Sequence, residues 1–193
     1  MDIPDVFNVT LPGEGIVLRE LEPADAAAAF VWGGDPQFFR FMTVDEVATE
    51  DEERTLLVEW QAEARARPRR QYRLGVVETD TATLVGIVRL GIVNPDHKEA
   101  DIGYGMRPDR WGRGVATAAA MLLVDFGFRE LGLHRVFAYH DPANHASRRV
   151  MEKLGMSYEG TLRQNMFGRG TWRDSALRAV LEHEWRDGGR ARS

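Results

Sequence analysis

The sequence lacks several features that define whole classes of protein. None of its 193 residues is cysteine, so disulfides and a cysteine nucleophile are both excluded. Its longest apolar run, Ala116 to Val124 interrupted by Thr117, is far too short to span a bilayer. The first residues show neither the basic start nor the apolar stretch of a signal peptide. We therefore expect a cytoplasmic protein that does not associate with membranes.

An excess of positive charge is also absent. The 25 lysines and arginines are outnumbered by 30 acidic residues, which argues against general nucleic-acid binding because that activity favours basic surfaces. His97, His145 and His183 show no metal-ligand spacing, so no metal site is expected. The length suits a single domain over residues 1–193, with an N-terminal arm at 1–15 and a frayed polar tail at 187–193.

The first half of the chain predicts two helices and a set of strands. A strand is expected at 16–21, a short helix at 26–32, and a second helix that begins after Thr49 and is capped with the help of Glu52. Three further strands, joined by tight turns and therefore antiparallel neighbours, are expected at 71–78, 83–93 and 99–106.

The second half begins with a helix over Gly112 to Phe128 that is apolar nearly all round, as expected of a helix buried against a sheet. A short strand at 135–139 follows, then a helix that Asn144 caps and Gly155 ends. A closing hairpin is expected at 157–167 and 171–181. The fold class is therefore α/β, with a mixed, mostly antiparallel sheet and helices on both of its faces.

The start of the long helix reads as an anion-binding loop. Gly112 and Gly114 allow a tight turn and close approach of a ligand, and the first amides of a helix have no intrahelical partner. Arg107, Arg110 and Arg113 add positive charge nearby. A glycine-rich loop without a ligand is the alternative. A dinucleotide site is disfavoured, because five residues separate Met106 from the first glycine and an antiparallel meander precedes the helix.

Four motifs together make the assignment specific. They are Trp111-Gly112-x-Gly114-x-Ala116, Leu131-Gly132-Leu133-His134-Arg135-Val136, Asp141-Pro142-x-Asn144-x-x-Ser147 and Lys153-Leu154-Gly155-Met156. This pattern resembles the GNAT superfamily of acyl-CoA-dependent N-acyltransferases, and more narrowly its RimJ/RimL branch. The resemblance runs from Ile16 to about Trp185, strongest between Ala100 and Arg163 and weakest before Tyr72. Trp111 departs from the Gln or Arg that usually opens the phosphate loop in the wider superfamily.

The resemblance implies acetyl-CoA as acyl donor and assigns residues to it. Trp111 and Gly112 open the phosphate loop, and the pyrophosphate would lie on the backbone amides of Arg113, Gly114, Val115, Ala116 and Thr117. The backbone of Met106 and Arg107 would pair with the pantetheine arm, because in this family the strand that carries Met106 splays from the next one. Asn144 would also bind that arm, in addition to capping its helix.

Three residues are candidates for the chemistry. In the RimJ/RimL branch, the residue matching Ser147 lies near the CoA sulfur, where it could protonate the leaving thiolate; a solvated or capping hydroxyl is the alternative. Asp101 matches an acidic residue that helps to deprotonate the amine, directly or through water, although it could instead face solvent. His140 could be a base or a substrate contact, or simply a packed histidine. Glu159 and Asp174 are weaker carboxylate candidates.

The acceptor pocket is the least legible part of the sequence. Trp32, Phe38, Phe39 and Phe41, followed by Met42, fall where the family builds this pocket, but such aromatic residues could equally form local core. The reaction implied is direct acetyl transfer from acetyl-CoA to a neutral amine. A protein or peptide N-terminal α-amine is the expected acceptor; the alternatives are a small-molecule amine or a non-catalytic acyl-CoA sensor. A homodimer is compatible with the sequence.

Overall fold

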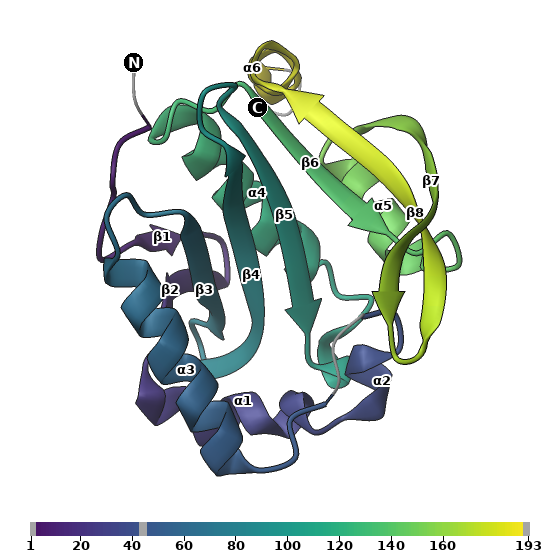
Figure 1. The fold of residues 1–193 in the computed structure, drawn as a ribbon. Helices are drawn as coiled ribbons and strands as arrows, with labels where there is room; N and C mark the ends of the chain where they lie inside the picture. Colours follow the sequence, from purple (N-terminus) through teal and green to yellow (C-terminus); the bar gives the residue numbers. More distant parts are fainter. Residues whose placement is uncertain (1–2, 43–45, 191–193) are drawn as a thin grey trace.

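The computed structural model describes residues 3–42 and 46–190, and its centre is one sheet of eight strands (Figure 1). The order across the sheet is β1-β2-β3-β4-β5-β6-β8-β7. The strands are β1 (Thr10–Pro12), β2 (Ile16–Glu20), β3 (Gln71–Glu78), β4 (Thr83–Asn94), β5 (Glu99–Met106), β6 (Arg135–His140), β7 (Ser157–Gly168) and β8 (Thr171–Leu181). All neighbouring strands are antiparallel except β5 and β6, which are parallel.

Helices cover both faces of this sheet. They are α1 (Ala26–Gly33), α2 (Pro36–Phe39), α3 (Glu50–Arg65), α4 (Val115–Arg129), α5 (His145–Lys153) and α6 (Glu182–Arg190), with two 3-10 turns at Pro23–Asp25 and Pro108–Arg110. In Figure 1, α4 and α5 lie behind the sheet, whereas α1 and α3 lie in front of its β3–β4 side. The predicted α/β fold, with a mixed, mostly antiparallel sheet and helices on both faces, is confirmed.

Two apolar clusters hold the layers together. The larger one joins α4 to the sheet, where Leu123 and Val124 are fully buried with Leu90 and Val136. The smaller one lies under α1 and α3 and includes Leu57. Burial of such side chains is the main favourable contribution to folding, at roughly 25 cal/mol for each Å² of apolar surface removed from water.

Several local predictions are confirmed by the hydrogen bonds. β3 and β5 have the predicted limits. The hydroxyl of Thr49 accepts from the amide of Glu52 at 3.2 Å, as expected of an N-cap. The side chain of Asn144 caps α5, and Gly155 ends that helix with a φ of 76°.

Four details differ from the predictions. Thr10–Pro12 forms an edge strand within the arm that was expected to be irregular, because it pairs with β2. A short helix, α2, occupies part of the aromatic segment, and its start is capped by Asp35. α4 begins at Val115 rather than at Gly112, because both glycines of the loop adopt positive φ values. α6 continues to Arg190, past the start of the expected frayed tail; residues 191–193 lie outside the described residues.

The indole of Trp185 explains why α6 stays folded against the sheet layer. Its ring lies 5.9 Å from that of Phe128, centroid to centroid, and its Nε1 donates to Asp125 at 3.0 Å. Both partners belong to α4, so a single side chain ties the last helix to the most buried one.

Replacement of Trp185 should therefore destabilise the protein through α6. We expect Trp185→Ala to lower the free energy of unfolding by about 1–3 kcal/mol, measured by chemical denaturation, and to increase proteolysis within residues 182–190. Arg186→Ala is the control, because its side chain is 72% exposed in an i,i+4 ion pair with Glu182 and should matter by no more than about 0.5 kcal/mol. Equal stability of the two variants would contradict this role of Trp185.

Candidate active site

The site begins where the two parallel central strands part. β5 and β6 pair only through Glu99 with Arg135, Ala100 with Val136, and Asp101 with Phe137. β5 continues to Met106 beyond this pairing. The splay that the family resemblance implied is therefore present in the fold.

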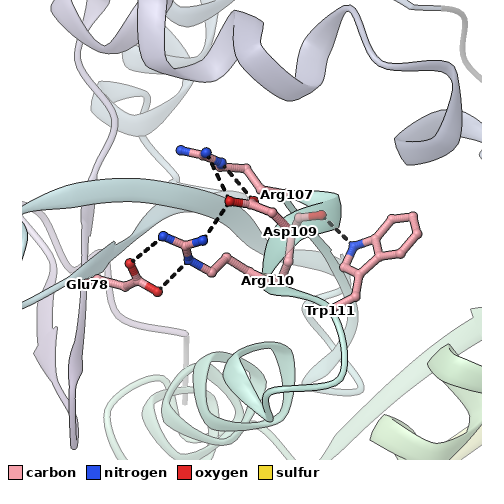
Figure 2. A network of polar contacts seen from close by, with 6 residues as sticks. Glu78, Arg107, Asp109, Arg110 and Trp111 are labelled. Carbon is pink, nitrogen blue, oxygen red and sulfur yellow. Dashed lines mark hydrogen bonds and ion pairs between the residues drawn. The ribbon is translucent and has the colours of Figure 1, made fainter.

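The edge of β5 beyond the splay carries main-chain groups that point away from β4. The amide of Arg107 donates to the carbonyl of Val85 at 2.9 Å, so the main-chain groups of Arg107 face β4. Because this orientation alternates along an antiparallel strand, the main-chain groups of Met106 and Tyr104 point away from β4, toward the edge that β6 leaves unpaired. The Met106 carbonyl there accepts a hydrogen bond from Trp111 Nε1 at 2.7 Å (Figure 2). A carbonyl oxygen has two lone pairs, so this one can accept a second donor.

The loop after β5 brings free amides to the end of this edge. Gly112 and Gly114 have φ values of 75° and 84°, which residues with a side chain adopt with difficulty. Apart from the adjoining residues, no described atom lies within 4 Å of the point where a Cβ atom would stand at either glycine. Gly114 is the N-cap of α4. The amides that follow, from Val115 to Thr117, precede the first intrahelical bond, which Ala118 donates to the carbonyl of Gly114. Residues 112–117 thus form a cradle of main-chain amides at a helix start, the kind of arrangement that can bind an anion.

The three arginines near the cradle differ in their partners, and Figure 2 shows two of them, Arg107 and Arg110. Arg110 donates to both carboxylate oxygens of Glu78, at 2.8 and 3.2 Å, and to Asp109 at 2.6 Å. Arg107 donates to Asp109 at 3.1 and 3.2 Å. Within the described part of the chain, Arg113 has no ion pair. Of the three, Arg113 is thus the arginine whose charge no described carboxylate engages, while Arg110 fastens the loop to the end of β3.

Across the splay, the start of α5 contacts β5 through Ser147. Asn144 Oδ1 accepts from the amide of Ser147 at 3.0 Å, which leaves the amide hydrogens of Asn144 available to a ligand. The hydroxyl of Tyr104 lies 3.0 Å from Ser147 Oγ and 3.1 Å from the Ser147 carbonyl oxygen. Burial raises the pKa of Tyr104 to about 12. Sequence reasoning missed Tyr104; the only signal was the strand alternation that puts it on one face with Ala100, Ile102 and Met106.

Asp101 lies on the opposite face of β5. It is three residues from Tyr104, and side chains of a strand alternate between faces. Both of its carboxylate oxygens accept from the guanidinium of Arg89 on β4, one of them at 3.1 Å from Arg89 Nη1. The structure therefore does not bring Asp101 and Ser147 together on one face. It places Asp101 at the last paired position before the splay.

His140 ends β6 and is only 6% exposed. Its Nδ1 lies 2.9 Å from the main-chain oxygen of Asp141. Because a carbonyl only accepts, Nδ1 carries the hydrogen in this contact. In the neutral imidazole Nε2 then presents a free lone pair, and it is buried without a hydrogen-bond partner among the described residues. Nε2 is thus the ring nitrogen of His140 that no described residue engages.

The two weaker carboxylate candidates are both engaged in structural contacts. Glu159 accepts from Arg135, at 2.6 Å from Nη1, and this hydrogen bond lowers the pKa of the Glu159 carboxyl. Asp174 accepts from the amide of Gln164 at 2.8 Å, within the β7–β8 hairpin. Glu159 is therefore held by a cation, whereas only one carboxylate oxygen of Asp174 is engaged in this contact.

Two of the four aromatic candidates, Trp32 and Phe38, lie in or against the smaller apolar cluster. Trp32 and Phe39 are buried, and Trp32 belongs to the cluster under α1 and α3. Phe41 lies beneath the guanidinium of Arg40, 5.1 Å from its ring centre. Phe38 lies directly on β5, since a Cβ atom at Gly105 would come within 2.4 Å of its ring. Of the four, Phe38 is the one that the structure places against the strand of the splay.

Comparison with known proteins identifies this arrangement. Residues 16–157 match the family described as Acetyltransferase (GNAT) domain. The chain belongs to the GNAT family of acetyltransferases. Among its relatives, the Probable N-acetyltransferase YjcK of Bacillus subtilis (strain 168) is 33% identical, over 89% of this chain and 96% of that one. A GNAT-family acetyltransferase from Bacillus anthracis has the same fold, with a TM-score of 0.80 and 27% identity over 91% of this chain and all of that one.

Two further relatives bear on the branch and on the acceptor. YdaF of Bacillus subtilis (strain 168), provisionally named a ribosomal N-acetyltransferase, is 28% identical over 89% of this chain and 94% of its own. It supports the assignment to the RimJ/RimL-like branch. The spermidine N(1)-acetyltransferase of Escherichia coli (strain K12) is 33% identical over 57% of this chain and 59% of its own.

The family membership establishes the GNAT protein as an acyl-CoA-dependent acetyltransferase, as the resemblance implied. Acetyl-CoA is the family's acyl donor, and an amine is its acceptor. No helix in the described residues is long and apolar enough to cross a membrane. Four points stay predictions: the identity of the acceptor, the formation of a homodimer, the localisation and the roles of single residues.

The cradle can be tested with a matched pair of glycine variants. Gly114→Asp should abolish CoA binding in calorimetry, because it adds a side chain and a negative charge where the pyrophosphate is expected. Gly132→Asp is the control, since Gly132 also has a positive φ, 62°, and open space around it, but lies beyond the other end of α4. It should share the backbone strain and keep CoA affinity. Retained affinity in Gly114→Asp would show that the pyrophosphate binds elsewhere.

Proposed function

We propose that this GNAT enzyme transfers an acetyl group from acetyl-CoA to the N-terminal α-amine of a protein or peptide. The observation that carries the choice of acceptor is the charge pairing around the open side of the splay. Among the described helices, α1 and α3 lie in front of β3 and β4 in Figure 1, and α2 packs Phe38 on Gly105 at the end of β5, whereas none lies in front of the middle of β5 and β6. An extended chain end can approach a strand pair from such a side.

The acyl donor occupies the splay in this proposal. The amides at the start of α4, from Arg113 to Thr117, hold the pyrophosphate, and Arg113 adds charge. The pantetheine arm pairs with the free edge of β5 at Met106, beside the side-chain amide of Asn144. Its sulfur then lies near Ser147. Trp111 shifts from, or shares, the Met106 carbonyl that it contacts here.

Five carboxylates on or near the strands β5 to β8 are already paired with cations. Each forms an ion pair with an arginine: Glu46 with Arg169, Glu99 and Glu159 with Arg135, Asp101 with Arg89, and Asp141 with Arg173. A polyamine brings two or more ammonium groups, and its affinity depends on acidic groups free to receive them. A peptide α-amine brings a single ammonium on an otherwise uncharged main chain. The charge pattern therefore favours the peptide.

A small amine is the second candidate, because the relative from Escherichia coli is a spermidine N(1)-acetyltransferase. A sensor that binds acetyl-CoA without turnover is the third. The three differ in what they consume, so release of the CoA thiol separates them.

An acceptor panel should distinguish the candidates. Short peptides with free N-termini should give a kcat/KM at least about tenfold above spermidine, equal to about 1.4 kcal/mol of transition-state discrimination. The measurement is thiol release with mass spectrometry of the product, and N-acetylated versions of the same peptides are the control. Faster turnover of spermidine would favour the small-amine reading. A rise in melting temperature with acetyl-CoA but no turnover of any acceptor would favour the non-catalytic sensor.

Two residues could remove the proton from the attacking amine, and their contacts favour His140. Asp101 has both oxygens engaged by Arg89, whereas His140 Nε2 is free. A base is needed here because an amine is mostly protonated at neutral pH and must be neutral to attack.

The choice of base can be decided by substitution. His140→Asn keeps a donor near the Asp141 carbonyl but removes Nε2, and should lower kcat/KM by about 10²-fold or more near neutral pH. The loss should shrink as the pH approaches the pKa of the acceptor amine, where the base is no longer needed. Asp101→Asn is the comparison and should have the smaller effect. The reverse ranking, in variants with unchanged CoA affinity, would assign the proton transfer to Asp101.

A further inference from the structure

We propose that Tyr104 is a positioning residue, which turns the hydroxyl hydrogen of Ser147 toward the sulfur of the leaving CoA. This inference rests on the proposed function, since it presumes acetyl transfer with the thioester near Ser147. Tyr104 reaches Ser147 from β5, across the splay and 43 residues earlier in the chain. It thus connects β5 with α5, between which acetyl-CoA would lie.

The number of hydrogens at this contact limits how it can be arranged. Tyr104 has one hydroxyl hydrogen, and its oxygen lies 3.0 Å from Ser147 Oγ and 3.1 Å from the Ser147 carbonyl oxygen. A carbonyl can only accept. When the phenol donates to the carbonyl, the Ser147 hydroxyl can donate to the phenol oxygen. Its hydrogen is then directed at Tyr104 and is withheld from any ligand.

The alternative arrangement releases that hydrogen without moving a heavy atom. When the phenol donates to Ser147 Oγ instead, the serine hydrogen is free to point elsewhere. The change costs little, because the Ser147 carbonyl lies in the first turn of α5 and has the helical bond of its own turn. A sulfur that gains negative charge favours this second arrangement, since it attracts the freed hydrogen.

Tyr104 is suited to this task by its surroundings. It sits on a central strand, and its ring packs against the main apolar cluster. Burial keeps its pKa near 12, so the phenol stays protonated and can donate throughout the working pH range. The Ser147 amide is fixed in turn by Asn144 Oδ1. Both oxygens of Ser147 and its main-chain nitrogen therefore have hydrogen-bond partners before acetyl-CoA binds.

The chemical contribution is a hydrogen bond to the departing sulfur. As the carbon–sulfur bond breaks, its electron pair moves to sulfur, and the carbonyl double bond of the amide forms. Ser147 donates to that sulfur while Tyr104 donates to Ser147. Neither residue loses a proton in the net reaction, because the proton gained by the CoA thiolate balances the one that the attacking nitrogen gives up.

A double-mutant cycle separates this role from a structural one. We expect Tyr104→Phe to lower kcat about tenfold and Ser147→Ala about 10²-fold, in single-turnover measurements of acetyl transfer. The double variant should match Ser147→Ala, because Tyr104 acts only through that hydroxyl. Acetyl-CoA affinity should not change in any of the three. Ser147→Thr, which retains the hydroxyl, should keep most of the activity and its dependence on Tyr104.

Tyr158→Phe provides a chemically matched control. The Tyr158 hydroxyl contacts that of Thr161 at 2.8 Å on the exposed β7 strand, so this variant also loses one phenol–hydroxyl hydrogen bond. Its kcat should equal that of the wild type. Unchanged kcat in Tyr104→Phe, or losses that add in the double variant, would overturn the inference while leaving acetyl transfer intact. Absence of turnover in the wild type against every amine would instead count against the proposed function.

Discussion

The parallel pairing between β5 and β6 is the constraint on which the rest of the site depends. It involves three residues of each strand and then stops. Below this point the sheet is continuous and carries the core. Beyond it, each strand has a free edge, and the segments that follow β5 and β6 turn into α4 and α5. One topological feature therefore supplies unpaired main-chain hydrogen-bonding groups and brings the starts of two helices to the same end of the sheet.

The two helix starts are prepared in different ways. α4 begins after glycines in left-handed conformations, with its first amides open to solvent. α5 begins with a side-chain cap, and its third residue is tied to β5 through Tyr104. A helix start with free amides suits an anion, whereas one fixed by side chains suits a precise placement of a hydroxyl. The division suits two parts of acetyl-CoA in the proposed function, its diphosphate and its thioester.

Local patterns in the sequence predicted most of the fold. The tight turns between β3, β4 and β5, the nearly continuous apolar run in α4 and the caps at Thr49 and Asn144 are local signals, and each appears in the structure. The short strand β1 could not be found in this way, because three residues carry no periodicity and form a strand only by pairing with β2.

The site was less predictable because its contacts join distant segments. Asp101 matched a family position, but its partner Arg89 follows from the register of β4 against β5. Tyr104 and Ser147 are far apart in the chain and meet only through the splay. The left-handed glycines at 112 and 114 and the helix after them, by contrast, could be predicted from the sequence, since a Gly-x-Gly turn before an apolar run is a local pattern.

The contact between Trp111 and Met106 has a consequence for solubility. An unpaired strand edge is a template on which another chain can add a strand, and proteins protect such edges. The free edge of β5 is internal to the molecule, but it opens where Met106 ends the strand. There the indole of Trp111 covers the last carbonyl at 2.7 Å. In the protein without acetyl-CoA, Trp111 therefore covers part of the edge with which the pantetheine arm would pair. The last carbonyl already accepts a hydrogen bond, so it is less open to a β-strand of another chain.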